Sequence, residues 1–385
     1  MRVLHIVSGR LYGGVETALV ATARNRSLCP EIEQEFALCF DGRLRDELTA
    51  SGAPVHMLGK VRVRYPLSVL RARRRLSELL NERTLNVVLC HLPWAHAIFG
   101  PVARAARIPL VFWAHGASDG RYWLERWARL TPPDLAICNS HFTATTMVRL
   151  YPGLVTQVIY QPIGLSPFIA SVNDRVEVRR ELTTPLDAAV IVQVSRMEEW
   201  KGQKLHLETL GRLRDLPSWV CWIIGAAQCP QEARYERELH AAAKQHGIEE
   251  RVRFAGQRSN VLRILSAADI FCQPNTGPEP FGISLVEALQ AGLPVITSAM
   301  GGATEIVNDS CGILVPPRSA TDLASALRLL INDTQLRCRL GAAGPARAQE
   351  LTDPAVHLSR LKSALEKLFV QPELNRRREN LDLAR

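Results

Sequence analysis

Short apolar segments alternate with helical patterns along almost the whole chain, and this alternation limits the possible folds more than any other feature. In the first half, the apolar segments are residues 3–7, 36–40, 55–58, 86–90, 110–114 and 135–138. Helical patterns lie between them, for example at residues 66–80 and 140–150. Because parallel neighbouring strands need a crossover that is usually a helix, this order predicts an α/β fold with a doubly wound parallel sheet.

The pattern stops once and then begins again, which predicts two domains. Residues 162–185 are mixed and polar, and further apolar segments follow at 188–194, 219–225, 252–254, 269–272 and 294–297. A chain of 385 residues is also too long for one ordinary hydrophobic core. We predict an N-terminal domain at residues 1–165, a linker at 166–185, a C-terminal domain at 186–350, and a helix with a polar tail at 351–385.

Composition and cysteine usage indicate a soluble, cytoplasmic protein. Hydrophobic residues make up 47% of the chain and charged residues 22%, and no apolar run approaches the ~18 residues that a membrane-spanning helix needs. The N-terminus enters an apolar segment at once, without the layout of a signal peptide. None of the nine cysteines belongs to a C-x-x-C pair and several lie in apolar segments, so we expect reduced core residues.

The net charge of +9 is concentrated in two basic clusters. One consists of Arg62, Arg64, Arg71, Arg73, Arg74 and Arg75, and the other of residues 376–378. Such clusters are either solvated surfaces or sites that attract an anionic membrane surface or an anionic acceptor molecule. Nucleic acid is not an expected partner, because no recognition motif or interleaved aromatic set accompanies the charge.

Two glutamates lie at a predicted strand-to-helix transition, where α/β proteins commonly build a ligand site. The segment is GPEPFGISLVEA, residues 277–288, followed by a helix that we expect to end at Gly292. Glu279 is therefore predicted in the loop over the helix N-terminus, and Glu287 about two turns later, on the helix. Either glutamate alone can simply be solvated. Together, carboxylates so placed can bind polyols while the helix N-terminus holds phosphate, which suggests a nucleotide-sugar site.

Two cations follow the first apolar segment of the second half. Arg196 and Lys201 are five residues apart, where they can converge on a diphosphate, the leaving group of a sugar nucleotide. Positive charge there would stabilise a dissociating transition state. The alternative is surface charge that pairs with Glu198 and Glu199.

Further candidates follow strands of the first half. Gly13 and Gly14 stand between the first strand and the first helix, where glycine permits close approach of a ligand, but their spacing is not G-x-G-x-x-G. His115 comes at the end of an apolar strand and is followed by glycine. His91 is a similar but weaker candidate, and either histidine can be structural.

With these residues assembled, the chain resembles the retaining glycosyltransferases of family 4, which have the GT-B fold. The matching segments are Arg196 with Lys201-Gly202, Gly225, 254–256, 268–269, 279–282 with 287–288, 292–296, 301–302 with 305–307, and 312–315. The resemblance implies two Rossmann-like domains that face a central cleft, with the acceptor on the N-terminal domain and the donor on the C-terminal domain. It also implies a C-terminal helix that crosses back to the first domain.

The resemblance further implies roles for single residues. The implied catalytic residues are His115, Arg196, Lys201 and Glu279. The implied donor-binding residues are Gly13, Gly14, Arg196, Lys201, Glu279, Phe281, Gly282, Ile283, Ser284 and Glu287. Among these, Glu287 would bind the ribose, the two cations the diphosphate, and Glu279 the donor sugar beside His115. Because the leaving phosphate can accept the acceptor's proton, Glu279 is expected to position the sugar and not to attack it.

The expected activity is transfer of a hexose, with retention, from a UDP- or GDP-sugar to a glycan, glycolipid or lipopolysaccharide-type acceptor at the cytosolic face of a membrane. The chain has no Asp-x-Asp motif, so we expect no metal and no cofactor. The alternatives are a phosphorylase or epimerase on the same fold and a catalytically silent sugar-nucleotide-binding protein. A nicotinamide oxidoreductase is disfavoured by the glycine spacing.

Overall fold

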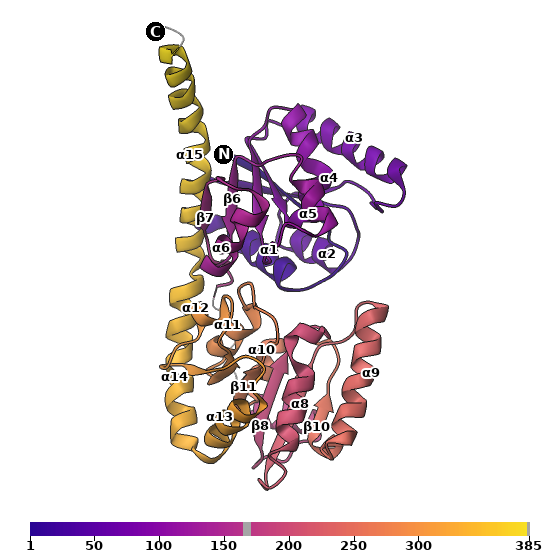
Figure 1. Cartoon of the computed structure of the whole chain (residues 1–385), viewed down its shortest axis with the longest axis vertical. Helices are drawn as coiled ribbons and strands as arrows, with labels where there is room; N and C mark the ends of the chain where they lie inside the picture. Colours follow the sequence, from indigo (N-terminus) through magenta and orange to yellow (C-terminus); the bar gives the residue numbers. More distant parts are fainter. Residues whose placement is uncertain (165–170, 383–385) are drawn as a thin grey trace. The chain divides into compact units, whose positions relative to one another are not determined.

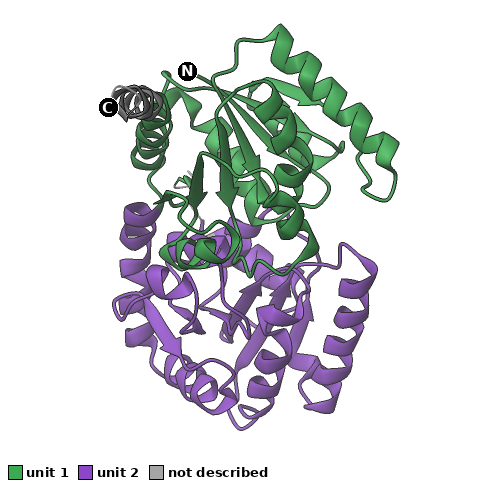
Figure 2. Ribbon diagram, turned by 45° about the horizontal axis from the view of Figure 1, so that its top comes forward, with its two compact units in different colours: residues 1–164, 352–385 green, residues 165–351 purple. Residues whose placement is uncertain are grey.

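The computed structural model describes residues 1–164 and 171–382, which fold into two compact units. Unit 1 combines Met1–Gly164 with Thr352–Arg385, and unit 2 is Leu165–Leu351 (Figure 2). The chain therefore leaves unit 1 once, builds unit 2 and returns to unit 1 near Thr352. Each unit has its own parallel sheet.

In the described part of unit 1, seven strands form one sheet in the order β3-β2-β1-β4-β5-β6-β7, and every pair is parallel. The strands are β1 (Arg2–Val7), β2 (Glu33–Leu38), β3 (Val55–Met57), β4 (Val87–His91), β5 (Leu110–Ala114), β6 (Leu135–Cys138) and β7 (Thr156–Val158). The strand order reverses between β1 and β4. Doubly wound sheets open a crevice for ligands at such a reversal, at the carboxyl ends of the strands.

Helices pack around this sheet (Figure 1). They are α1 (Gly14–Arg24), the 3-10 helix η1 (Arg26–Leu28), α2 (Arg43–Ala50), α3 (Pro66–Glu82), α4 (Leu92–Ala105), α5 (Trp123–Ala128), α6 (His141–Leu150) and the last helix, α15 (Pro354–Asp382). Leu358, Leu361 and Leu365 of α15 are three and four residues apart, which places them on one helix face. They are buried against Val3 and Val111 of the sheet, so the C-terminal helix packs in unit 1 as predicted.

In the described part of unit 2, six strands form a parallel sheet in the order β10-β9-β8-β11-β12-β13. The strands are β8 (Ala189–Val194), β9 (Trp219–Ile224), β10 (Val252–Phe254), β11 (Ile270–Gln273), β12 (Val295–Ser298) and β13 (Gly312–Val315). The helices are α7 (Val172–Glu181), η2 (Glu199–Lys201), α8 (Gln203–Gly211), α9 (Pro230–Gln245), η3 (Glu249–Arg251), α10 (Val261–Ser266), α11 (Ile283–Gln290), α12 (Ala303–Ile306), α13 (Ala320–Asn332) and α14 (Thr334–Thr352). The strand order is the Rossmann order, with its reversal between β8 and β11.

The predicted fold class, two doubly wound parallel sheets, is confirmed. The predicted strands are present with small shifts at their ends, whereas β7 and β13 were not predicted as strands. β7 has three residues, of which Thr156 and Gln157 are polar, and β13 has four residues and begins at Gly312. Both are edge strands, which need less apolar sequence because only one side of each is paired.

The segment predicted as a linker, residues 166–185, contains a helix of unit 2. Helix α7 begins after Ser171, whose hydroxyl accepts a hydrogen bond from the Asp174 N–H at 3.1 Å. The helix has no apolar stripe, so its sequence resembles a polar connection. The remaining predicted linker residues at 166–170 lie outside the described part of the chain.

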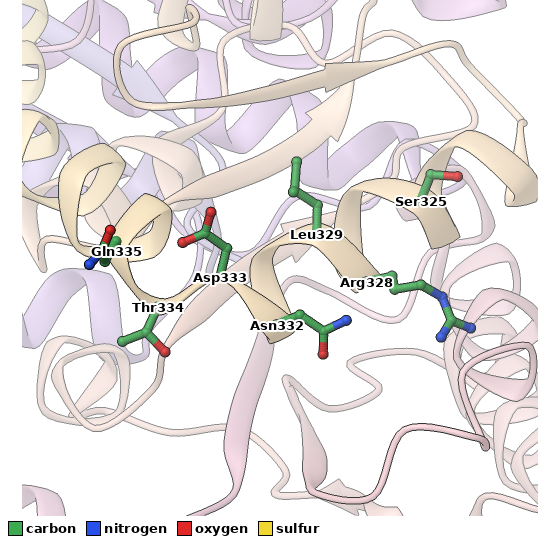
Figure 3. A pocket seen from close by; sticks show the side chains of 7 residues that line it. All are labelled: Ser325, Arg328, Leu329, Asn332, Asp333, Thr334 and Gln335. Atoms are coloured by element: carbon green, nitrogen blue, oxygen red, sulfur yellow. The ribbon is translucent and has the colours of Figure 1, made fainter.

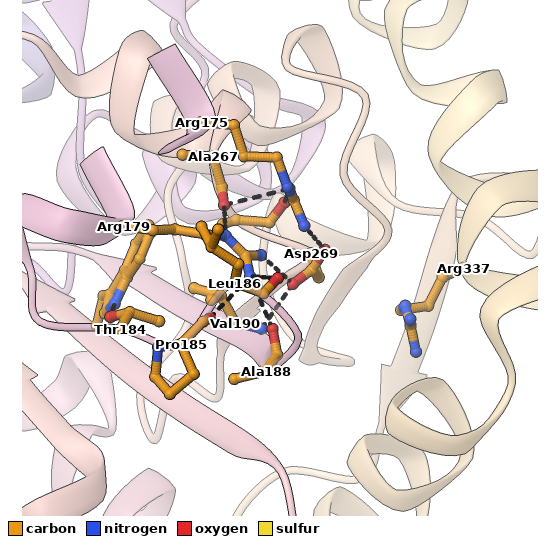
Figure 4. A network of polar contacts seen from close by, with 12 residues as sticks. Arg175, Arg179, Thr184, Pro185, Leu186, Ala188, Val190, Ala267, Asp269 and Arg337 are labelled. Atoms are coloured by element: carbon orange, nitrogen blue, oxygen red, sulfur yellow. Dashed lines mark hydrogen bonds and ion pairs between the residues drawn. The ribbon is translucent and has the colours of Figure 1, made fainter. Parts of the chain in front are cut away.

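Two arginines of α7 bind Asp269 at the start of β11 (Figure 4). The fully buried Arg179 donates from Nη2 to Asp269 Oδ2 at 2.7 Å, and Arg175 donates to Oδ1 at the same distance. Arg179 also donates to the Ala267 carbonyl at 3.1 Å, and the Val190 N–H donates to Asp269 Oδ2 at 2.7 Å. A buried guanidinium is tolerated only when its donors are satisfied in this way. Asp269 therefore fixes α7 to the sheet of unit 2.

The cysteines are mostly core residues. Seven of the nine are buried, Cys229 is half-buried and Cys338 is exposed, so the expected core location holds except at Cys338 and, in part, at Cys229. In the described residues, no helix is both long enough and apolar enough to cross a membrane.

Candidate active site

Glu279 lies in the loop between β11 and α11, at the carboxyl end of a central strand of unit 2. Its Oε2 accepts hydrogen bonds from Lys201 Nζ at 2.8 Å, Asn275 Nδ2 at 2.7 Å and Gln273 Nε2 at 3.1 Å. The Glu279 side chain is 7% exposed and that of Lys201 is 14% exposed. Within the described residues, Oε1 has no partner. Glu279 thus presents one fixed oxygen and one free oxygen.

Glycines allow the main chain around this loop to pack closely. Gly202 has a φ of 74°, and a Cβ at this position would overlap the Pro274 carbonyl oxygen. A Cβ on Gly301 would overlap the main chain of Glu279, whose carbonyl accepts the Gly302 N–H at 2.7 Å. Because no other residue lacks a Cβ, these glycines support the loop that holds the carboxylate.

Trp200 connects two loops of the site. Its carbonyl oxygen accepts the N–H groups of Thr276 at 2.8 Å and Gly277 at 3.3 Å. Lys201 Nζ lies 4.0 Å from the centre of the indole ring, within cation–π distance. The aromatic ring therefore helps to hold Lys201 in the position from which it binds Glu279.

Arg196 follows β8 but binds other carboxylates. It forms ion pairs with the buried Glu232 of α9 and, at 3.3 Å, with Glu198. Glu232 Oε2 accepts the Gln228 N–H at 2.6 Å. The structure thus brings Lys201 and Glu279 together, and it places Arg196 in a separate ion-pair group that includes one of the two glutamates expected from the sequence.

The first turn of α11 lies beside the Glu279 loop. Gly282 caps the helix with a φ of 109°. Ser284 donates from Oγ to Gln273 Oε1 at 3.0 Å, so it contacts the same glutamine that binds Glu279. Phe281 is buried, and Ile283 is half-buried at the first helical position. The N–H groups of a helix start therefore lie next to the carboxylate.

Glu287 lies on α11, at the position predicted from its spacing to Glu279. Its half-buried carboxyl group has no hydrogen-bond or ion-pair partner among the described residues. Loss of hydration disfavours the charged form and raises the pKa of Glu287 to about 7. The group is a hydrogen-bond acceptor that the protein itself leaves unused.

In unit 1, Gly13 and Gly14 form the start of α1. Gly13 is the N-cap residue in an extended conformation, and its N–H donates to Glu16 Oε2 at 3.0 Å. The N–H and hydroxyl of Thr17 both donate to the Gly13 carbonyl at 3.0 Å. This turn is therefore held by its own helix, at the carboxyl end of β1.

His115 belongs to a buried row of histidines on three neighbouring strands. His115 Nε2 lies 2.8 Å from His91 Nδ1, and His91 Nε2 lies 3.0 Å from His5 Nδ1. At the other end, Gln161 Nε2 lies 3.1 Å from His115 Nδ1. The stacked rings have centroids 5.1 Å and 5.2 Å apart. His91 is thus part of the same group as His115.

Burial keeps these three histidines neutral. Desolvation lowers the pKa of His5 and of His115 to about 3, and it lowers the pKa of His91 well below its ordinary value. A neutral imidazole has one donor and one acceptor nitrogen. With Gln161 donating, each ring donates from Nε2 to the Nδ1 of the next, and Nε2 of His5 has no partner in the described structure. Both nitrogens of His115 are occupied, so proton transfer by this ring would require one contact to break.

Sequence reasoning missed the residues that hold the predicted ones. They are Gln273, Asn275, Glu232, His5 and Gln161. A signal existed for three of them: two amides directly follow the apolar core of β11, and a histidine interrupts the apolar strand β1. No local pattern marks the other two, because their partners are distant in the chain.

A pocket of about 760 Å³ in unit 2 is separate from these residues (Figure 3). It is lined by the end of α13 and the start of α14: Ser325, Arg328, Leu329, Asn332, Asp333, Thr334 and Gln335. Arg328 is paired with Asp215 at 2.6 Å. Residues 1–164 and 171–382 contain no group of three or more His, Cys, Asp or Glu side chains placed to hold a metal ion.

The chain has two Rossmann-type sheets, and it shares the GT-B fold of solved glycosyltransferases that it resembles in structure. Residues 174–347 match the family model described as Glycosyl transferases group 1, and residues 12–166 match the model Glycosyltransferase Family 4. The chain belongs to family 4 of the glycosyltransferases, as its sequence motifs predicted.

Solved structures with this fold include HepE of Anabaena in complex with UDP-glucose. That structure is 25% identical, has a TM-score of 0.85, and covers 95% of this chain and 100% of its own. The lipopolysaccharide glycosyltransferase WaaG has a TM-score of 0.70 over 95% of this chain and 99% of its own, at 16% identity, which shows a shared fold only.

Curated relatives include a D-inositol 3-phosphate glycosyltransferase of Stackebrandtia nassauensis, which is 29% identical over 57% of this chain and 51% of its own length. The lipopolysaccharide core biosynthesis glycosyltransferase LpsE of Rhizobium meliloti is 32% identical over 43% of this chain and 46% of its own. The chain spans about half the length of these relatives.

Proposed function

We propose that the protein is a retaining hexosyltransferase that uses a nucleotide diphospho-sugar, a UDP- or GDP-sugar, as its donor. The observation that carries this proposal is the carboxylate of Glu279, which is fixed on one oxygen by Lys201, Asn275 and Gln273 and free on the other. A fixed, largely neutralised carboxylate beside a helix start suits the hydroxyl groups of a sugar.

Glu287 is proposed to bind the ribose of the donor. Its carboxyl group has no partner in the part of the chain that the structure describes, and it lies on the helix that begins beside Glu279. Two vicinal hydroxyls would satisfy both carboxylate oxygens and would favour the ionised form of a group whose pKa is about 7.

The diphosphate of the donor is proposed to bind the cations Arg196 and Lys201 together with main-chain amides. The candidate amides are those at the start of α11, from Phe281 to Ser284, and that of Gly14. The N–H of Gly13 already donates to Glu16, so Gly13 is proposed to contribute close approach of the main chain to the donor. His115 is proposed to lie beside the donor sugar, where its neutral ring positions the sugar and transfers no proton. These groups supply the positive charge that a metal would otherwise bring, so we propose a metal-independent reaction.

Retention is proposed to follow a front-face path in which the leaving phosphate accepts the proton of the acceptor hydroxyl. Three donors on Oε2 of Glu279 reduce its strength as a nucleophile, which supports a positioning role. Product analysis by NMR, with the anomeric configuration compared before and after transfer, tests this step. An inverted product would contradict it.

UDP is the first donor nucleotide to test, because HepE of Anabaena, with 25% identity, is solved in complex with UDP-glucose. The acceptor is proposed to be a glycan, a glycolipid or a lipopolysaccharide-type molecule, and the relative LpsE, named a lipopolysaccharide core biosynthesis glycosyltransferase, supports the last of these. We further propose that the enzyme works at the cytosolic face of a membrane. Flotation with anionic vesicles tests that location, and absence from the lipid fraction at low salt would contradict it.

A thermal-shift series with UDP, GDP, ADP and CDP is the decisive first experiment. One nucleotide should raise the melting temperature, because a ligand that binds only the folded state stabilises it by mass action. Incubation with the matching sugar nucleotide and acceptor then separates the alternatives. Turnover with inorganic phosphate would indicate a phosphorylase, an isomerised donor would indicate an epimerase, and binding without any product would indicate a silent protein.

A further inference from the structure

Unit 1 contains a pocket of about 740 Å³ that none of the roles above uses. It lies where the loop after β1 and the segment before α3 meet the starts of α4 and α5. Helix α4 contacts both α3 and α5, and Figure 1 labels all three. The volume is within the range of small-molecule sites.

Four cations line this pocket, and its lining contains no acidic residue. Arg10, Lys60, Arg62 and Arg64 are all exposed, and none of them forms an ion pair with a carboxylate of the described residues. Some other exposed arginines of unit 1 have partners, such as Arg104 with Asp134 at 2.8 Å, and others, such as Arg107, have none among the described residues, so it is the gathering of four unpaired cations in one pocket that is distinctive. Gathered like charges repel, and an anionic ligand would relieve that repulsion.

The basic cluster found in the sequence therefore divides into two parts. Within α3, Arg73 and Arg75 donate to main-chain carbonyl groups at 2.7 Å and 3.3 Å, and Arg74 pairs with Glu78 at 2.8 Å. The exposed Arg71 of α3 has no such partner among the described residues, but it does not line the pocket. The two arginines that precede the helix have no such partners and line the pocket. Both guanidinium groups thus lack an anionic partner at the pocket, although Arg64 lies 5.0 Å from the centre of the Tyr65 ring, and guanidinium forks match the oxygens of phosphate and carboxylate.

Aromatic side chains also line the pocket. Trp94 of α4 is half-buried, whereas Tyr122 and Trp123 are 55% and 51% exposed, with ring centroids 6.0 Å apart. Large aromatic rings exposed at a concave site indicate a ligand that packs on them. The C–H face of a sugar ring has the required shape and polarity, whereas a bare inorganic anion does not.

We propose that this pocket binds a saccharide that carries a phosphate or carboxylate group, with the anion on the cations and the ring on the aromatic side chains. The binding of such a saccharide is inferred only from the residues that line this pocket. The identification of this ligand as the acceptor rests on the proposed glycosyl transfer, and it narrows the acceptor to anionic saccharides.

Titration calorimetry on the full chain tests the proposal with glucose 6-phosphate, glucuronate, glucose and inorganic phosphate as probes. At least one charged sugar should bind more tightly than glucose and than phosphate. The double change Arg62→Gln with Arg64→Gln should weaken that binding by about tenfold per guanidinium group. The charge-matched control, Arg71→Gln with Arg74→Gln, should leave it unchanged. Trp123→Ala should weaken the binding of the charged sugar and leave the binding of inorganic phosphate unchanged.

UDP binding by the same variants serves as the check on folding and keeps the two proposals separate. If the wild-type chain does not bind UDP, the donor assignment is contradicted, whereas the ligand proposed for this pocket is not affected. Equal affinities for glucose and for both charged sugars would overturn the proposal. Binding to phosphatidylglycerol vesicles that requires Arg62 and Arg64, with no binding of either charged sugar, would overturn it in favour of a membrane surface.

Discussion

Lys201 neutralises Glu279 within the loop site of unit 2, so each side chain depends on the other. Their contact is 2.8 Å long and largely shielded from water, which makes it stronger than an exposed ion pair. Removal of either partner leaves an unpaired charge beside two amide donors. The ion pair is therefore a fixed part of the site before any ligand arrives.

Lys201→Ala is predicted to cost ~2 to 4 kcal/mol of transition-state stabilisation, mainly in kcat, because it removes positive charge from the proposed leaving group. Arg196→Ala should have a cost of the same order. Lys204→Ala is the matched control, since Lys204 is 51% exposed and pairs with Glu238 outside the site. Steady-state kinetics measures the effect, and wild-type turnover by the Lys201 variant would remove its diphosphate role.

Glu287 gives the site a predicted pH dependence. Its folded pKa of about 7 means that the group is mostly protonated at pH 6 and mostly ionised at pH 8. If ribose hydroxyls donate to the carboxylate, they bind the ionised form, so UDP affinity should rise about tenfold over this range. Calorimetry at both pH values measures it. The same series with Glu287→Gln, in which only UDP itself titrates, is the control, and an identical pH profile would refute the ribose role.

At the scale of elements, α7 is attached to unit 2 by charges and not by an apolar face. Arg179 is fully buried in contact with Asp269, whereas Arg175 binds the same carboxylate from a side chain that is 40% exposed. One aspartate thus carries two contacts of the same chemistry in different environments. The pair offers a controlled comparison of buried and exposed charge.

Arg179→Ala is predicted to destabilise unit 2 by about 3 to 5 kcal/mol, because it leaves buried carbonyl groups and part of Asp269 without a partner. Arg175→Ala should cost about 1 kcal/mol or less. Urea unfolding followed by tryptophan fluorescence compares them, with Trp219 and Trp222 buried in unit 2 as reporters. If the two substitutions lower the free energy of unfolding equally, then burial does not determine how much each arginine contributes to stability.

Elements with an apolar period could be predicted from the sequence, and α7 shows why others could not. The alternating strands and the leucine face of α15 are local patterns that reflect burial directly. Helix α7 is bound through side chains that pair with a residue 90 positions away, which no local pattern contains. A polar helix and a polar linker therefore look alike until the partner is known.

The candidate site divides in the same way. Glu279, Glu287 and Lys201 could be found because they stand at strand ends and helix starts, where ligand sites form. The Lys201–Glu279 ion pair could not be predicted from the sequence, because it joins residues 78 positions apart in the chain. The pairing of Arg196 with Glu232 likewise depends on how α9 packs, and not on sequence near Arg196.

At the scale of the whole molecule, both units bury neutral histidines. Desolvation lowers the pKa of His5, His115 and His206 to about 3 and that of His96 to about 4, and it also lowers the pKa of His91. Between these values and 6.5, the unfolded chain binds protons that the folded chain does not. Lower pH therefore favours unfolding.

Stability is predicted to fall steeply below pH 6.5, by about 1 kcal/mol for each such histidine between pH 7 and pH 5.5. Denaturant unfolding at the two pH values measures the loss. His206→Asn keeps a donor toward Gln193, which His206 Nδ1 contacts at 2.8 Å, and should remove one histidine's share of the pH dependence. An unchanged pH dependence in this variant would contradict the assignment.

The return of the chain to unit 1 has a consequence for its synthesis on the ribosome. Unit 2 is continuous in sequence, so all of its strands are available soon after residue 351 has been made. Unit 1 has its sheet complete far earlier, but Leu358, Leu361 and Leu365 must still cover Val3 and Val111. The first unit to be translated is thus the last to close its core, and its uncovered sheet face is the surface that nascent-chain chaperones would meet.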